Sequence, residues 1–256
     1  MTPELVRLDF DGSPAPALGH PVRSIDLSHV HGTRYATERD TFDALRDTLA
    51  AVPLDTVLLG SGDFHHHALH GLLRKREPFS LVLFDNHADL GPSDVITCGA
   101  WVEAALAIPA LAAVLLVACE ASTLVGVKAP LERVAWVPLD NDVIRGVRTT
   151  VSLRAGGLAQ ALDDLPTRRV HVSIDKDVLH PDDATTGWSH GGMRLEELIG
   201  ALGEVARRCV IESFDLCGDA PLSPVDRLSP AGIAVMERNT RADRAILDQL
   251  LGASAR

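Results

Sequence analysis

The chain has 256 residues, 46% of them hydrophobic, and a formal net charge of −11 at pH 7. The acidic charge argues against nucleic acid or an anionic membrane surface as a partner, because both bind clustered Lys and Arg. The four cysteines include no Cys-x-x-Cys pair, which argues against a disulfide framework or a structural zinc knuckle.

Apolar runs and helical spacings alternate along the chain. We predict strands, in chain order, at Leu5–Asp9, Ser24–Ser28, Val52–Leu59, Ser80–Phe84, Ala112–Ala118, Val134–Leu139, Val170–Ile174 and Cys209–Phe214. We predict helices at Thr41–Ala51, His65–Leu73, Cys98–Ile108, within 150–164, and at Leu195–Arg207 and Ala231–Leu251. Alternating strands and helices indicate a mostly parallel central sheet with helices on both faces, a three-layer α-β-α fold. No linker divides the chain, so residues 1–256 are taken as a single domain.

The N-terminal residues Met1–Leu5 lack the basic and apolar segments of a secretory signal. The longest uncharged apolar run, residues 104–119, contains Pro109 and is shorter than the roughly 18 residues that a membrane span requires. We therefore expect a cytoplasmic protein that does not bind membranes. Its acidic charge is compatible with a small cationic substrate.

Four predicted strands end in side chains of the kinds that bind metals or act in catalysis. These strand-end segments are Gly60–His67, Asp85–Asp89, Asp175–Asp177 and Glu212–Asp215. The carboxyl ends of parallel strands lie at one edge of a sheet, where α/β proteins place their sites. We therefore expect the four segments to converge.

Two of these segments carry closely spaced carboxylates. If the chain stays extended past Phe84, the side chains of an Asp-x-His-x-Asp triplet at 85–89 point to one side. Asp175 and Asp177 repeat the i, i+2 spacing. A lone Asp after a strand is commonly a turn or helix-cap residue. Two such groups together would repel unless a cation compensated their charge, so the sequence predicts a metal site.

The ligand types narrow the choice of metal. Carboxylates suit Mn²⁺ or Mg²⁺, and imidazoles move the preference toward Mn²⁺, Fe²⁺, Co²⁺ or Zn²⁺. The charges of two divalent ions would balance the four carboxylates, which are Asp85, Asp89, Asp175 and Asp177. A two-ion site can generate hydroxide near neutral pH.

These segments resemble the signatures of the arginase/agmatinase, or ureohydrolase, family. The family carries Gly-Gly-Asp-His, Asp-Ala-His-x-Asp and Ser-x-Asp-x-Asp elements, and their counterparts here are Gly62–His65, Asp85–Asp89 and Ser173–Asp177. The resemblance covers about residues 57–216 and implies an arginase-like fold. It also implies two Mn²⁺ ions per chain.

Each ion has an implied ligand set. By the resemblance, one Mn²⁺ would be bound by His65, Asp85, Asp89 and Asp175, and the other by His87, Asp85, Asp175 and Asp177. A hydroxide bridging the ions would attack the guanidinium or amidine carbon, and Asp89 would pass its proton to the leaving amine. Phe64 is inserted into the first element, so His65 or His66 could be the ligand, and we favour His65.

Three further residues are candidates for contacts with the substrate. Cys98 stands where the family has a His, and a thiol at a helix N-terminus could have a lowered pKa and replace it in catalysis. The family's substrate-facing acid after the last strand would be Asp215, with Glu212 as the less favoured register. Trp188 lies in a loop that could face the pocket, although simple loop packing would explain it equally well.

Three functions remain open. The first is a binuclear manganese-dependent hydrolase of linear C–N bonds in a guanidino, amidino or formimino compound. The second is a deacylase-type hydrolase of the same fold with one zinc ion. The third is a metal-binding homologue without catalysis, for which Cys98 is the best support. Members of the family are often trimers or hexamers, so a homo-oligomer is expected by analogy alone.

Overall fold

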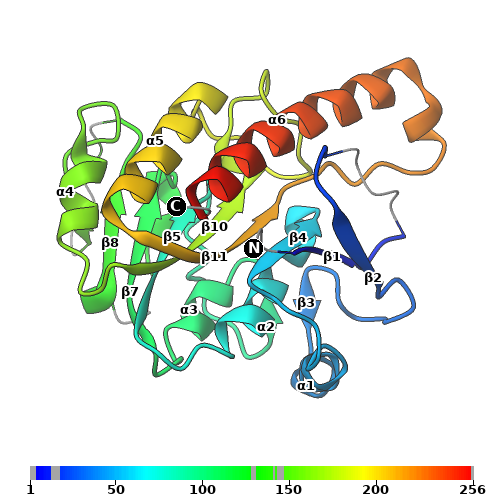
Figure 1. The fold of residues 1–256 in the computed structure, drawn as a ribbon, viewed down its shortest axis with the longest axis horizontal. Helices are drawn as coiled ribbons and strands as arrows, with labels where there is room; N and C mark the ends of the chain where they lie inside the picture. The colour runs from blue at the N-terminus through cyan, green and yellow to red at the C-terminus, as the bar shows by residue number, and fades with distance from the viewer. Residues whose placement is uncertain (1–3, 13–17, 128–130, 141, 143–146, 255–256) are drawn as a thin grey trace.

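A nine-stranded sheet runs through the centre of the protein (Figure 1). The computed structural model describes residues 4–12, 18–127, 131–140, 142 and 147–254. The strands lie in the order β2 (Val22–Asp26), β1 (Leu5–Asp9), β4 (Thr56–Gly60), β11 (Val210–Cys217), β10 (Arg169–Asp175), β5 (Phe79–Phe84), β7 (Leu111–Val117), β8 (Val134–Val137) and β9 (Arg148–Thr149). Every pairing in this sheet is parallel, so all nine carboxyl ends lie at one edge.

Helices cover both faces of the sheet (Figure 1). One face carries α1 (Arg39–Thr48), α2 (Leu69–Leu72) and α3 (Trp101–Ala105), and the other carries α4 (Gly157–Asp163), α5 (Leu195–Arg208) and α6 (Pro230–Ser254). Strand β5 shows how the layers form. Its side chains alternate, with Leu81 and Leu83 in the core under α1–α3 and Val82 and Phe84 in the core under α4–α6. The predicted three-layer α-β-α fold is confirmed.

The shorter elements lie mostly around the carboxyl edge. Strands β3 (Ala36–Thr37) and β6 (Ile96–Thr97) form a small antiparallel pair. The 3₁₀ turns are η1 (Gly62–Ala68), η2 (Ala121–Leu124), η3 (Leu131–Arg133), η4 (Lys176–Val178) and η5 (Asp226–Leu228). No helix in the described part of the chain is both long and apolar enough to cross a membrane.

Most predicted elements are confirmed, with ends that differ by a few residues. The two-residue strands β3, β6 and β9 were not predicted, because so short a pairing leaves no periodicity to read. Two helix predictions were wrong in extent. The first four residues of the helix predicted at His65–Leu73 belong to the 3₁₀ turn η1, and only Leu69–Leu72 are α-helical. The helix predicted at Cys98–Ile108 begins only at Trp101.

Three buried histidines, His66 and His67 of η1 and His70 of α2, pack among aromatic rings. The ring of His67 stacks on Phe10 with centroids 4.2 Å apart, and that of His70 stacks on Phe42 at 4.0 Å. Burial lowers the pKa of His67 to about 4 and the pKa of His70 to about 2. These imidazoles are therefore neutral at pH 7 and serve as packing groups.

Replacing His70 with phenylalanine is expected to make the fold less sensitive to acid. An unfolded histidine binds a proton below about pH 6.5, whereas folded His70, with its pKa near 2, does not. The unfolded state thus binds more protons in this window, and the free energy of unfolding falls as the pH falls. From about pH 7.5 to 5.5 this one group removes about 1.4 kcal/mol.

Urea unfolding at both pH values checks this expectation. The His70→Phe variant should lose about 1.4 kcal/mol less than the wild type over this range. The variant His29→Phe, which removes an exposed imidazole, is the control and should behave like the wild type. Equal losses in the wild type and His70→Phe would contradict a neutral buried His70.

Candidate metal centre

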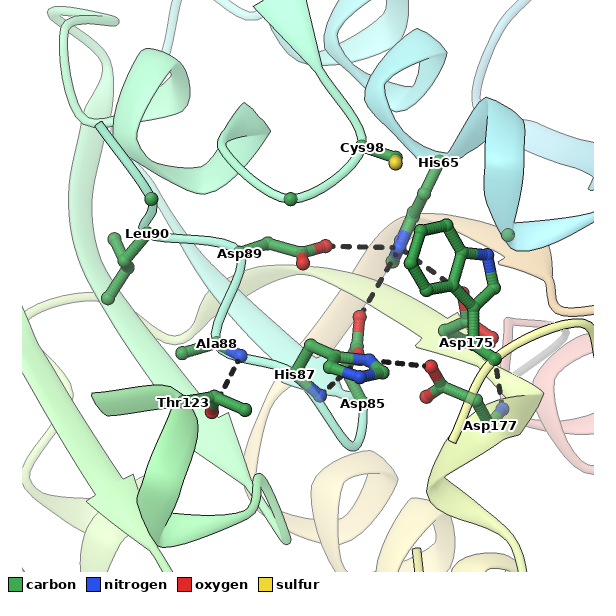
Figure 2. A pocket seen from close by; sticks show the side chains of 14 residues that line it. His65, Asp85, His87, Ala88, Asp89, Leu90, Cys98, Thr123, Asp175 and Asp177 are labelled. Carbon is green, nitrogen blue, oxygen red and sulfur yellow. Dashed lines mark hydrogen bonds and ion pairs between the residues drawn. The ribbon is translucent and has the colours of Figure 1, made fainter. Parts of the chain in front are cut away.

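A cavity of about 210 Å³ opens at the carboxyl edge of the sheet, where β4, β5 and β10 end (Figure 2). Its donor side chains are His65, Asp85, His87, Asp89, Asp175 and Asp177. The rest of its lining is small or apolar and comprises Gly62, Ala88, Leu90, Gly91, Cys98, Gly99, Thr123 and Trp188. All six predicted metal ligands therefore line one cavity.

The chain after β5 turns instead of staying extended, so the expected straight row of ligands was wrong. Asp85 Oδ1 accepts a hydrogen bond from the backbone N–H of His87 at 2.6 Å, which bends the chain. Asp89 then adopts a left-handed backbone with φ 49°. The three side chains nevertheless line the same cavity, where Figure 2 shows them together with His65.

The end of β10 has a similar turn. Asp175 ends the strand, and Asp177 lies in η4, where its backbone N–H donates to Asp175 Oδ1 at 2.9 Å. Asp177 Oδ1 accepts from the backbone N–H of Asn86 at 2.9 Å, which joins the two loops. Between the two acids, Lys176 points away from the cavity and donates to Asp243 of α6 at 2.5 Å.

The structure separates the two candidate histidines of η1. His65 lines the cavity, whereas His66 Nε2 lies 2.8 Å from Thr37 Oγ1, outside it. His65 Nε2 lies 2.8 Å from Ser173 Oγ, and that hydroxyl donates to Asp215 Oδ1 at 2.9 Å. Ser173 therefore accepts from His65 Nε2–H, which leaves the lone pair on His65 Nδ1 facing the cavity.

The donor atoms form two groups that share Asp85. His65 Nδ1 lies 3.3 Å from Asp85 Oδ2 and 3.6 Å from Asp89 Oδ2. His87 Nδ1 lies 3.6 Å from Asp85 Oδ1 and 2.7 Å from Asp177 Oδ2. In each group, one ligand atom from every residue lies within 4.8 Å of the others. Asp175 Oδ2 lies 3.7 Å from His65 Nδ1, beside the first group.

Negative charge is concentrated and buried in this site. Burial raises the pKa of Asp89 well above its usual range, and the nearby Asp85 charge adds to the shift. Burial and the Asp175 charge likewise raise the pKa of Asp177. Burial lowers the pKa of His87, but hydrogen bonds to Asp177 and Asp85 outweigh it and raise the pKa to about 11. Protons or cations must therefore compensate these carboxylates.

These residues fit divalent metal ions. His65 Nδ1 is buried without a hydrogen-bond partner although carboxylates surround it, which is costly unless a cation occupies the space between them. Carboxylates with imidazole are the donors that Mn²⁺ and related ions take. The Nε2 atoms of both histidines, which do not face the other donors, also have hydrogen-bond partners, as in metal-bound histidines. His65 Nε2 lies 2.8 Å from Ser173 Oγ, and His87 Nε2 lies 2.9 Å from Ser189 Oγ.

Asp215 and Glu212 do not line the cavity, so their placement as substrate-facing acids was wrong. Strand β11 continues to Cys217, and Asp215 is therefore a buried strand residue that bonds to Ser173 and, at 2.7 Å, to His171 Nε2. Glu212 lies near the other end of the strand, where it pairs with Arg169 at 2.7 Å. Asp215 thus orients His65 through the Ser173 hydroxyl, which bonds to both side chains.

The other two candidates do line the cavity. Cys98 follows β6 and precedes α3 by three residues, so it is not at the helix N-terminus. Burial and the Asp89 charge raise the pKa of its thiol to about 12, so the expected lowering was wrong.

Trp188 is 39% exposed and stands edge-on to His87 at 6.0 Å, while its Nε1 donates to Asp63 at 3.0 Å.

Two supporting residues were not predicted. Trp101 Nε1 donates to Asp89 Oδ2 at 2.7 Å, and the Trp101 ring packs 4.7 Å from the His65 ring. Ser189 holds His87. Trp101 had only the signal of an apolar helix residue, and Ser189 lies in a loop without a motif, so neither was distinguishable by sequence.

Comparison with known protein sequences gives two matches. A model of the arginase family matches residues 15–237. A protein from Thermotoga maritima described as uncharacterized is 29% identical over 190 residues, which cover 74% of this chain and 68% of that protein.

Solved structures share the fold. An arginase from Entamoeba histolytica, in complex with L-ornithine, is 15% identical with a TM-score of 0.64 and a match over 98% of this chain and 100% of that chain. A formimidoylglutamase from Bacillus subtilis is 14% identical with a TM-score of 0.62, over 98% and 86% of the two chains. At such identities the likeness shows the fold alone.

Proposed function

The chain belongs to the arginase family, and we propose that it is a binuclear manganese-dependent hydrolase of linear C–N bonds in a small guanidino, amidino or formimino compound. The observation that carries this proposal is the pair of donor groups sharing Asp85. A carboxylate common to both groups could bridge two adjacent ions. The hydrolase fold of the family is consistent with this chemistry.

We assign the residues to the two ions as the resemblance implies, except that Asp175 would contact only the first ion. His65, Asp89 and Asp85 would hold one ion, and His87, Asp177 and Asp85 the other, with Asp175 beside the first. When bound, the ions would supply a water molecule of lowered pKa as the nucleophile.

Asp89 is the group we assign to proton transfer. Its carboxyl group points across the cavity toward His65 (Figure 2). Burial and the Asp85 charge raise its pKa, which makes the carboxylate a better proton acceptor, and it would release that proton to a leaving amine. The Trp101 N–H fixes one carboxyl oxygen and so orients the other. Cys98, with a pKa of about 12, stays protonated at neutral pH and does not act as the base.

The cavity favours a compact substrate. Its volume of about 210 Å³ lies below the roughly 300–1,000 Å³ of sites for drug-sized ligands. In the described part of the chain, its only carboxylates are Asp85, Asp89, Asp175 and Asp177. The remainder of the substrate would therefore contact Trp188, Thr123, Cys98 and the backbone of Gly91 and Gly99. The acidic cluster and the Trp188 ring suit a cationic or amidine-bearing group.

The geometry argues against the two alternatives. A deacylase with one zinc ion would need a single donor group, whereas two groups share Asp85. A homologue without catalysis would not need an open cavity beside the donors, and the cavity here is open to solvent.

A substrate panel tests the proposal. The purified protein loaded with Mn²⁺ is expected to release urea, formamide or ammonia from at least one of a set of small guanidino, amidino and formimino compounds. The same protein after chelation is the control and should release none. Release from no compound by protein with two bound Mn²⁺ would overturn the proposal, and one zinc ion per chain with amide hydrolysis would favour the deacylase.

A further inference from the structure

Cys217 and Asp175 are neighbours across the two central strands. The register of the β10–β11 pair places Asp175 opposite Cys217, just as it places Ser173 opposite Asp215. Side chains in register leave a parallel pair on the same face, so the thiol follows Asp175 to the face that carries η1. The thiol is buried, with 1% exposure, and donates to Asp175 Oδ2 at 3.2 Å.

Cys217 completes a third group of donor atoms with Asp175 and His65. One ligand atom from each of the three residues lies within 4.8 Å of the others. His65 is 1% exposed, and its Nδ1 has no hydrogen-bond partner while it faces Asp175 Oδ2 at 3.7 Å. This unpaired nitrogen indicates, independently of the cysteine, that a cation belongs between these side chains.

We propose that Cys217 binds the ion beside His65 as a thiolate, and that this position takes a thiophilic divalent ion such as Zn²⁺ or Co²⁺ in preference to Mn²⁺. Thiolate favours the softer ions, whereas carboxylates suit Mn²⁺. On binding, a sulfur–metal bond forms and the Sγ proton leaves to solvent. The donor group of His87 contains no sulfur and retains a preference for Mn²⁺. The inference rests on the two-ion site of the proposed function and replaces Mn²⁺ at one of its two positions.

Cobalt titration of the metal-free full-length protein tests this inference. Binding is expected to produce a near-ultraviolet thiolate-to-cobalt charge-transfer band in the wild type. The variant Cys217→Ser should lack the band, and its Zn²⁺ affinity should fall at least about 10–100-fold, the range that loss of outer-shell partners already causes. Its Mn²⁺ affinity at the His87 group should not change.

Two variants serve as controls. Cys209→Ser alters the residue just before β11, at the opposite end of the strand from Cys217, and should keep the band. Cys98→Ser removes the thiol that lines the cavity and should also keep it. Loss of the band in Cys98→Ser would overturn the assignment to Cys217.

X-ray absorption of the zinc-loaded wild type requires no variant to fold. A sulfur neighbour at about 2.3 Å from zinc is expected. Two bound ions without any sulfur neighbour and without the band would overturn the inference and leave the proposed function standing. Failure to bind any divalent ion would instead overturn the proposed function.

Discussion

An asparagine in place of Asp85 is expected to lower turnover at least about 10³-fold, because this carboxylate belongs to both donor groups. Its two oxygens face different histidines, with Oδ2 3.3 Å from His65 Nδ1 and Oδ1 3.6 Å from His87 Nδ1. An amide has the same shape but no charge, so neither ion keeps its full ligand set. Metal ions contribute several kcal/mol of transition-state stabilisation, and each 1.36 kcal/mol corresponds to about a factor of ten.

The free energy of unfolding is a second measurement on Asp85→Asn, and it does not depend on activity. Ions that bind only the folded state raise its free energy of unfolding by about 4.1 kcal/mol at 1,000 times the dissociation constant. The wild type should show this rise in unfolding titrations with Mn²⁺, and Asp85→Asn should show little of it. The exposed Asp94→Asn, which removes the same charge outside the donor groups, should match the wild type. Full metal stabilisation of Asp85→Asn would contradict a shared ligand.

The ligand set was predictable because two independent patterns coincide. The continuous apolar run of β5 identifies a strand buried on both faces, and such strands occur in parallel sheets whose carboxyl ends share an edge. Asp85, His87 and Asp89 follow that run directly, so their convergence with Asp175 and Asp177 needed only the sheet topology. The local backbone was predicted wrongly, yet the convergence did not depend on it.

The substrate side was not predictable in the same way. The apolar run up to Phe214 predicts that Asp215 follows the last strand, but β11 continues through Leu216 to Cys217. A polar residue at every second position is also what a strand shows when one of its faces supports a site. Ser213, Asp215 and Cys217 form such a stripe. Sequence alone does not distinguish a stripe within a strand from a strand end.

The remaining differences between the predicted and the observed site concern loop residues. Cys98 follows the short strand β6, whose pairing with β3 depends on residues about 60 positions earlier, so the helix start at Trp101 could not be placed from local spacing. Trp188 and Ser189 reach the site through contacts with Asp63 and His87. Such long-range contacts leave no periodic signal in one sequence.

Replacing Gly218 with alanine is expected to destabilise the fold by roughly 2–5 kcal/mol, the sum of backbone strain and overpacking. Gly218 follows β11 with φ +98°, a conformation that residues with a side chain rarely adopt. An added Cβ would lie 2.4 Å from Asp175 Oδ1 and 2.5 Å from the backbone nitrogen of Lys176. Relief of that clash requires Asp175 to move, so turnover should fall by about 10²-fold, the cost of a displacement near 1 Å.

The variant Gly126→Ala separates backbone strain from overpacking as causes of the lost stability. Gly126 has a similar φ of +77°, but a Cβ there would meet no atom within 4 Å. This control should therefore lose only the roughly 1–2 kcal/mol of left-handed strain and keep its metal affinity and turnover. Urea unfolding and metal titration of both variants provide the comparison. If the two variants lost equal stability and both kept metal affinity, the close approach of Gly218 to Asp175 would have no role in shaping the site.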